Sequence, residues 1–220
     1  MKPLMDRVVY AIVRTLVAVI QMLPLAACDT ISVWVSWLAV DVLKFRYRVV
    51  DENLRRVFPA MSQVARDKMA RGMWEHLVLM VCEIAHVPRK IHETNWRKYI
   101  RIHNKKLLTS YLIDERPTLL LSAHFGNFEL AGVTAGLLGF RTHTVARDLD
   151  NRLVSEFFQG LRESKGQYML PKEGSAPMIN RVLDAQGIIA LLGDQYAGPK
   201  GCWVDFFGHP TSYHKAVAVF

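Results

Sequence analysis

A chain of 220 residues, 51% of them hydrophobic, can form one large domain or one domain with an appendage. Its 28 lysines and arginines outnumber its 20 aspartates and glutamates, and the formal net charge of +8 favours anionic partners: nucleic acid, acidic lipid or an acidic protein. Three distant cysteines without a CxxC spacing argue against a disulfide framework and against a structural zinc site.

Two apolar runs open the chain. Residues 8–28 are almost wholly apolar, and a second apolar run spans residues 31–40. Because apolar sequence continues past any plausible cleavage point, a removable signal peptide fits poorly. At about 1.5 Å per helical residue, the first run is just long enough to span a bilayer, whereas the second is too short.

Basic residues flank this pair of runs on both outer sides, with Lys2 and Arg7 before it and Lys44, Arg46 and Arg48 after it. Because cationic flanks tend to stay cytoplasmic, both ends of the pair should lie on the same side of a membrane. We therefore expect residues 1–48 to form membrane-associated helices that lie in one leaflet. The alternatives are a single crossing and two buried helices of a soluble core.

Residues 51–117 read as helical and basic. Pro59 ends one helix, and Ser62 is a candidate N-cap for the next, over about residues 63–86. Apolar residues recur in this helix at spacings of three and four: Met69, Met73, Leu77, Met80 and Ile84. Such a stripe predicts a helix face packed in the core rather than a cofactor site.

From residue 118 onward, strand and helix signals alternate. Apolar runs predict strands over residues 118–123, 142–146 and 188–193. The helices between them should begin after the capping residues Asn127, Asn151 and Ser175 and end at Gly139, Gly166 and Gly187. This βαβαβ rhythm predicts an α/β fold, with a mainly parallel sheet flanked by helices.

Polar side chains follow each predicted strand. His124 comes after the first strand, Arg147 after the second, and Asp194 with Gln195 after the third. Strands of a parallel sheet point the same way, so these groups should gather at its carboxyl edge, where open α/β sheets bind their ligands. We therefore expect the functional site at this edge.

The stretch from His124 to Glu129 suits a general base with an orienting carboxylate. On one continuous helix the two would lie about 140° apart, because each residue turns about 100°. A turn at Phe125-Gly126-Asn127 would instead put Glu129 in the first turn of a helix, from which it can fold back on the imidazole. Without a GxSxG nucleophile the histidine would activate an incoming hydroxyl or water directly, and without HxxxH or HExxH spacing a metal site is a weak alternative.

Several short blocks occur in a recognisable order: NLRRVFP at 53–59, HFGNFE at 124–129, RDLDN at 147–151, LRESKG at 161–166, and DQ at 194–195 with GCWVDFFGHPT at 201–211. Through these blocks, residues 51–215 resemble the bacterial late acyltransferases of lipid A biosynthesis, of the lauroyl and myristoyl transferase type. That family lies within the H-x4-D/E glycerolipid acyltransferase superfamily. Phe128 and Asp148 stand where the family usually has Trp and Pro.

The resemblance implies a set of roles and partners. His124 and Glu129 would be the catalytic pair, and the substrate-binding residues would be Gly126, Asn127, Arg147, Asn151, Arg162, Asp194 and Gln195. An acyl carrier protein thioester would donate the acyl chain to a hydroxyl of a lipid A precursor or a similar membrane glycolipid. Neither a metal nor an organic cofactor would be needed, and nucleic acid would not be a partner.

The resemblance also implies a place in the cell and an extent for each part of the chain. Residues 1–48 would hold the protein at the cytoplasmic face of the bacterial inner membrane, and residues 49–220 would form a glycerolipid acyltransferase-like domain. Since the family normally continues for tens of residues, we expect this domain to be incomplete at its C-terminus.

Two other functions fit part of the sequence. One is an acyltransferase that acts on glycerol phosphate, lysophospholipid or another glycolipid. The other is a non-catalytic basic membrane-binding protein, which would explain the N-terminus and the charge but would leave the polar groups at the strand ends unexplained.

Overall fold

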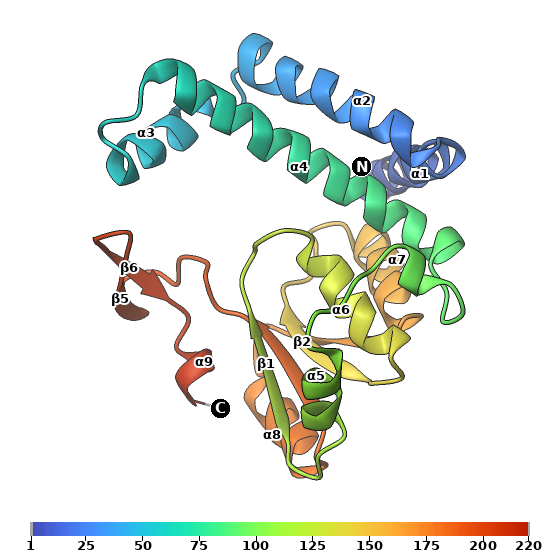
Figure 1. Cartoon of the computed structure of the whole chain (residues 1–220). Helices are drawn as coiled ribbons and strands as arrows, with labels where there is room; N and C mark the ends of the chain where they lie inside the picture. The colour runs from blue at the N-terminus through green and yellow to red at the C-terminus, as the bar shows by residue number, and fades with distance from the viewer. Residues whose placement is uncertain (1, 220) are drawn as a thin grey trace. The chain divides into compact units, whose positions relative to one another are not determined.

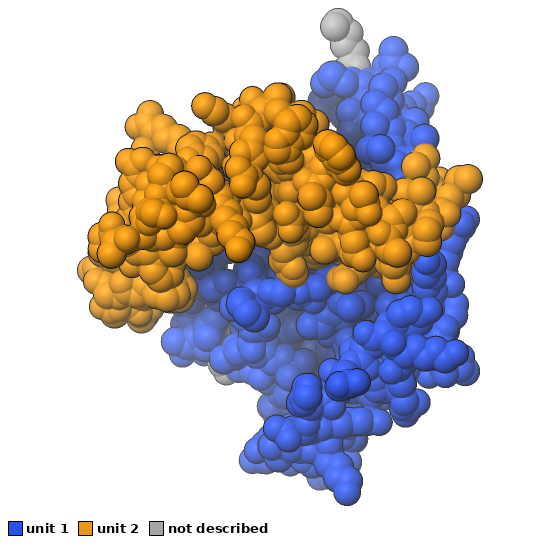
Figure 2. All heavy atoms as spheres, turned by 45° about the horizontal axis from the view of Figure 1, so that its top comes forward, with its two compact units in different colours: residues 1–17, 87–195, 214–220 blue, residues 18–86, 196–213 orange. Residues whose placement is uncertain are grey.

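In the computed structural model, which describes residues 2–219, the chain divides into two compact units (Figures 1 and 2). Unit 1 takes in the residues up to Val17, Val87–Gln195 and the residues from His214 on. Unit 2 consists of Ala18–His86 and Tyr196–Tyr213. Each unit is therefore built from separate stretches of sequence, and the division of the chain at residue 48 stays a prediction.

The centre of unit 1 is a four-stranded parallel sheet with the strand order β1-β4-β2-β3 (Figure 1). The strands are β1 (Thr118–Ser122), β2 (Thr142–Ala146), β3 (Gln167–Pro171) and β4 (Ile188–Leu192). The predicted α/β fold with a mainly parallel sheet is confirmed. The prediction missed β3, whose run Gln-Tyr-Met-Leu-Pro begins with a buried polar residue and ends in a proline, and so lacks the apolar continuity of β1 and β4.

Helices cover both faces of this sheet. On one face, Ile179 of α8 (Ala176–Asp184) packs in a core cluster with Ile189 and Leu191 of β4, and Leu170 lies against the cluster. Gln167 lies an odd number of residues before Leu170 and so faces the other side, where it approaches Gly132 of α6 (Phe128–Leu137). Helix α7 (Arg152–Glu163) packs against β3.

The predicted caps fix where α6 and α7 begin. The side chain of Asn127 accepts a hydrogen bond from the backbone N–H of Leu130 at 2.9 Å, and that of Asn151 accepts one from Val154 at 3.2 Å. Each cap satisfies one of the backbone donors that a helix start leaves unpaired. Unit 1 also contains the 3₁₀ turn η2 (Trp96–Lys98), α5 (Lys105–Leu112) and α9 (Ala216–Val219).

The N-terminal apolar sequence forms two helices that meet at Pro24, α1 (Lys2–Met22) and α2 (Leu25–Trp37). Helix α2 continues without a break into the π-helical turn η1 (Leu38–Val42). The resulting span, Leu25–Val42, is long and apolar enough to cross a membrane by length and composition. The expectation that the second apolar run is too short was therefore wrong, because the helix starts before that run and ends after it.

Helix α2 lies along the long helix α4 (Gln63–Lys90) within unit 2 (Figure 1). A polar contact joins the two at Ser36 and Glu75, at 3.5 Å, and His86 of α4 also lies 3.0 Å from the carbonyl oxygen of Leu23, just before α2. The buried residues of α4 are Arg66, Ala70, Cys82, Ala85, His86 and Val87. Met69 and Met73 are exposed, so the predicted core stripe was wrong at its start, where Arg66 and Ala70 are buried instead.

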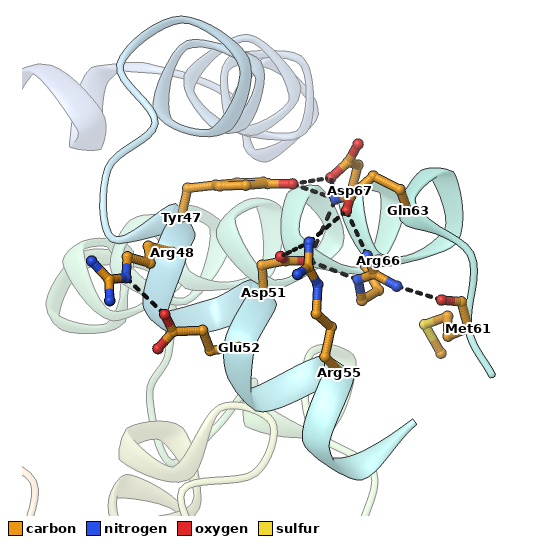
Figure 3. Close-up of polar contacts among 9 residues, drawn as sticks. All are labelled: Tyr47, Arg48, Asp51, Glu52, Arg55, Met61, Gln63, Arg66 and Asp67. Carbon is orange, nitrogen blue, oxygen red and sulfur yellow. Dashed lines mark hydrogen bonds and ion pairs between the residues drawn. The ribbon is translucent and has the colours of Figure 1, made fainter. Parts of the chain in front are cut away.

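A charge network joins α4 to α3 (Tyr47–Val57) in unit 2 (Figure 3). Asp51 accepts a hydrogen bond from Arg66 at 2.7 Å and pairs with Arg55 at 2.8 Å, while Tyr47 donates to Asp67 at 2.6 Å. The hydrogen bond from Arg66 lowers the pKa of Asp51, and the hydrogen bond to Asp67 raises the pKa of Tyr47 to about 12. These bonds fix the turn between the two helices.

An antiparallel hairpin completes unit 2, with β5 (Cys202–Phe206) paired to β6 (His209–Tyr213). Its tip reaches the end of α3, where His209 lies 3.0 Å from the carbonyl oxygen of Arg56 and the rings of Phe58 and Phe207 meet edge to face.

Candidate functional site

His124 lies directly beyond β1, at the carboxyl edge of the sheet, and one carboxylate holds it at two points. Its backbone N–H donates to one oxygen of Asp194 at 2.8 Å, and its ring Nδ1 lies 2.7 Å from the other oxygen. Asp194 follows β4, the strand that pairs with β1, so the sheet order itself brings the two residues together. The sequence predicted both residues at this edge.

The Asp194 contact decides what the imidazole can do. A carboxylate accepts hydrogen bonds, so Nδ1 carries the hydrogen of this bond and Nε2 is left as the basic nitrogen. Burial by itself would raise the pKa of Asp194, but the hydrogen bonds from the ring and the backbone of His124 outweigh burial, and the pKa lies below its ordinary value. Phe128 packs against the imidazole edge to face, with ring centroids 4.7 Å apart. The ring is thus oriented on two sides.

Glu129 lies in the first turn of α6, as the sequence predicted, but its carboxylate faces a different partner. Both of its oxygens accept hydrogen bonds from the guanidinium of Arg162, at 2.5 and 2.9 Å. The turn at Gly126, which has φ of 62°, places the start of α6 so that Glu129 points toward α7. The expected contact between Glu129 and the imidazole is thereby replaced by a bidentate ion pair, an especially strong geometry for these two groups.

The remaining predicted residues fall into two groups. Arg147 and Gln195 lie at the carboxyl edge beside the site, and the exposed guanidinium of Arg147 pairs with Asp150 at 3.0 Å. Asn127 and Asn151 cap α6 and α7, and the amide of Asn151 also donates to the carbonyl of Asp6 at 2.9 Å. The structure therefore gives the two asparagines a role in building the site's walls.

A pocket of about 450 Å³ opens beside His124, entirely within unit 1. Its polar lining includes His124, Glu129, Arg147, Arg162 and Gln195. Its apolar lining includes Phe128, Val145, Met169, Ile179, Leu191 and Val217. A cavity with a few convergent polar groups and an apolar wall is typical of a site that binds a small or chain-like apolar ligand with a polar end.

Two further ionisable residues line this pocket, Lys172 and His214, and neither was predicted from the sequence. Lys172 follows β3, so finding the fourth strand would also have found this cation at the carboxyl edge. His214 follows the hairpin, and its backbone N–H reaches the carbonyl of Gly193 at 3.4 Å. Nothing in its local sequence distinguishes it from the other histidines.

Among residues 2–219, no group of three or more His, Cys, Asp or Glu side chains is placed to hold a metal ion.

The family described as bacterial lipid A biosynthesis acyltransferase matches residues 2–219 of the chain. No match to a curated protein was found. The family match covers both the N-terminal helices and the sheet with its pocket.

Proposed function

The chain belongs to the bacterial lipid A biosynthesis acyltransferase family, and we propose that it moves a fatty acyl chain from an acyl carrier protein thioester to a hydroxyl of a lipid A precursor or a similar membrane glycolipid. The observation that carries this proposal is the paired His124 and Asp194 at the mouth of a pocket with an apolar wall. The pair supplies a base for the hydroxyl, and the pocket supplies a surface for the chain.

In this mechanism Nε2 of His124 takes the proton from the acceptor hydroxyl as its oxygen attacks the thioester carbonyl. Asp194 holds the ring and stabilises the imidazolium that forms. The tetrahedral intermediate then collapses, the carbon–sulfur bond breaks, and the imidazolium returns its proton to the departing thiolate. The products are an ester and a free thiol, so no covalent bond to the protein is required.

The cations around the pocket have separate proposed roles. Arg162 is neutralised by Glu129, and this pair fixes α6 against α7 and so holds Phe128 on the imidazole. Arg147, whose ion pair with Asp150 is exposed to solvent, and Lys172 are the cations that face anionic groups of the acceptor, such as a phosphate. Backbone N–H groups near Gly126 are the candidate donors to the thioester oxyanion. Glu129 therefore acts on the walls of the site, and Asp194 takes the orienting role that the sequence gave to Glu129.

The place of action follows from the same proposal. A membrane glycolipid acceptor requires the pocket to work at a bilayer surface, and the Leu25–Val42 span is a candidate anchor. We place the protein at the cytoplasmic face of the inner membrane, where its basic flanking residues would stay.

Purified protein, incubated with a radiolabelled acyl group on an acyl carrier protein and with a panel of acceptors, tests the proposal. The panel contains a lipid A precursor, glycerol phosphate and a lysophospholipid. We expect label in the lipid A precursor and loss of that label in His124→Ala. Transfer to glycerol phosphate or lysophospholipid alone would assign a different acceptor, and label in none of them with well-folded protein would reject the acyltransferase mechanism.

A further inference from the structure

A short segment of unit 1 carries a dense positive charge that the proposed reaction does not use. Between residues 97 and 106 lie five exposed cations, Arg97, Lys98, Arg101, Lys105 and Lys106, and no acidic residue. We call these ten residues the basic segment. It runs from η2 through the connection to the first turn of α5 (Figure 1).

These cations are available to a partner. Within the described part of the chain, none of the five takes part in an ion pair with Asp or Glu. Arg97 and Lys105 instead lie over the ring of Trp96, at 4.7 and 5.5 Å from its centroid. Cations over an aromatic face keep their charge, so the segment presents a concentrated positive field to solvent.

The basic segment is fixed to the wall of the pocket. Trp96 is buried and packs with Ile91 against Val133 and Leu137 of α6. The nearby chain is held further by Lys165, which donates to the carbonyl of Ile91 at 3.1 Å. Helix α6 carries Glu129 in its first turn, and at about 1.5 Å per residue Leu137 lies about 12 Å further along the helix axis. A partner on the segment is therefore within reach of the pocket through an extended arm.

We propose that the basic segment is the docking surface for the acyl donor, a protein with an acidic surface that carries the acyl thioester on a flexible arm. The inference rests on the proposed function, because it assigns a surface to the donor of that reaction. Charge complementarity speeds encounter and fixes orientation in such complexes. A carrier held here presents its arm along α6 toward His124.

The chemistry of the segment favours a protein partner over a lipid bilayer. Trp96, which directly precedes the segment, is 4% exposed, and Tyr99 within the segment is an exposed aromatic side chain. A helix or loop that binds a membrane surface places such side chains outward, in the acyl region. The long exposed apolar stretches of the chain lie instead on α1 and α2.

The test reverses charge on the segment without disturbing Trp96. The variant combines Lys98→Glu, Arg101→Glu and Lys106→Glu, which leaves Arg97 and Lys105 on the ring. The matched control combines Lys68→Glu, Arg181→Glu and Lys200→Glu, three exposed cations elsewhere, and so makes the same change in net charge. Each protein is assayed with an acyl carrier protein thioester and with an acyl-pantetheine thioester, which has the arm but no protein.

We expect the segment variant to raise the KM for the carrier-bound donor by about tenfold, the sum of three modest surface charge contacts. Its kinetics with acyl-pantetheine should match those of the control. The dependence of the carrier KM on salt should also be weaker than in the control. An unchanged carrier KM, or an equal loss with both donors, would reject the docking surface while leaving the proposed function intact.

Two further measurements separate the remaining outcomes. Binding of a fluorescent acyl carrier protein to His124→Ala and to the segment variant reports docking without turnover, so docking can be measured even if transfer fails. We expect His124→Ala to bind the carrier as the wild type does and the segment variant to bind it about tenfold more weakly. Flotation with vesicles that contain anionic phospholipid completes the set, and a loss of flotation in the segment variant but not in the control would show that the segment binds lipid and overturn the proposal.

Discussion

The two bonds from Asp194 to His124 make the position of the imidazole depend on one carboxylate. The backbone bond ties the start of the loop after β1 to the end of β4, and the ring bond sets the tautomer. Since Nδ1 is occupied, the proposed proton transfer has one nitrogen left, Nε2. Removing the imidazole of His124 should therefore lower the transfer rate, whereas removing the charge of Asp194 should change how stability depends on pH.

Replacing His124 by Ala should remove the base and leave the fold in place. We expect the rate of acyl transfer to fall by about 10² to 10⁴, the usual contribution of a general base. The side chain lies at the pocket mouth and is partly exposed, so the melting temperature should change little. Transfer rates and thermal unfolding measured on the same preparation check this, and near wild-type transfer would remove His124 from catalysis.

Replacing Asp194 by Asn should make stability depend less on pH. In the folded protein the pKa of Asp194 is below its ordinary value, so its ionised form stabilises the fold. This contribution is present above the unfolded pKa of about 3.9 and is lost as the pH falls through the lower, folded pKa. The difference in melting temperature between wild type and Asp194→Asn should thus be largest near neutral pH and shrink below about pH 4. Thermal unfolding across pH 3–7 measures it, and a constant difference would mean that the bond does not depend on the charge.

For single residues, the sequence predicts where a side chain lies better than it predicts which side chain it contacts. His124, Arg147 and Asp194 were placed at one sheet edge because each follows a strand, and the structure has them there, with Asp194 bonded to His124. The partner of His124 was wrong in the prediction because nearness in sequence favoured Glu129. The choice depends on where α7 puts Arg162, and helix packing of that kind leaves no local signal.

Among the elements, α6 lies unusually close to the chain that leads into β3. A Cβ added at Gly136 would lie 1.5 Å from the carbonyl oxygen of Lys165. One added at Gly132 would lie 2.5 Å from the side-chain amide of Gln167. The glycines on this face therefore let the helix that carries Glu129 approach β3 and the residues before it.

Gly136→Ala should destabilise the protein, because the obstructing atom belongs to the backbone. We expect a loss of about 1–3 kcal/mol in the free energy of unfolding, as for other overpacked sites. Gly160→Ala, in α7, is the control, since a Cβ there meets nothing within 4 Å. That change should stabilise by up to about 1 kcal/mol through helix propensity. Chemical denaturation measures the free energy of unfolding of both variants. Equal values for Gly136→Ala and Gly160→Ala would mean that α6 can shift without a loss of stability.

The elements were predictable where a short-range signal existed. The asparagine caps and the apolar strands β1 and β4 gave clear signals, and the structure has all of them. Strand β3 did not, because its first residue, Gln167, is polar yet buried, and its last, Pro171, is a weak strand former. The hairpin of β5 and β6 was not predicted, because polar and apolar residues do not alternate clearly in its aromatic run and every residue of β5 is exposed.

For the whole molecule, the distribution of side chains on α2 is the reverse of that on a surface helix of a soluble protein. Its buried residues are Cys28, Ser32 and Ser36, while Ile31, Trp34 and Leu38 of the continuous span are exposed. Small residues at four-residue intervals allow close packing against α4, as in helix pairs within membranes. The large apolar side chains then face outward, which supports a lipid contact for this span.

Replacing Ile31, Trp34 and Leu38 together by Ser should weaken membrane binding. Each of these side chains contributes about 1.5–3 kcal/mol when it moves from water into an apolar phase. The control changes Val64, Ile113 and Met178 to Ser, three exposed apolar residues outside the span. Flotation with phospholipid vesicles should show loss of binding in the first variant and retention in the second. Equal binding of the two would exclude the outer face of α2 as the anchor.

The strand order also has a consequence for biosynthesis. Within residues 2–219, β1 pairs with β4 and with no other strand, and two further strands separate β1 from β4 along the sequence. At about 5–20 residues per second, the ribosome takes roughly 3–13 s to make the residues between Ser122 and Ile188. During that interval an apolar strand, already released, has no partner for its backbone and is open to chaperones and to aggregation. Asp194 emerges directly after β4, so the strand that pairs with β1 also brings His124 its carboxylate.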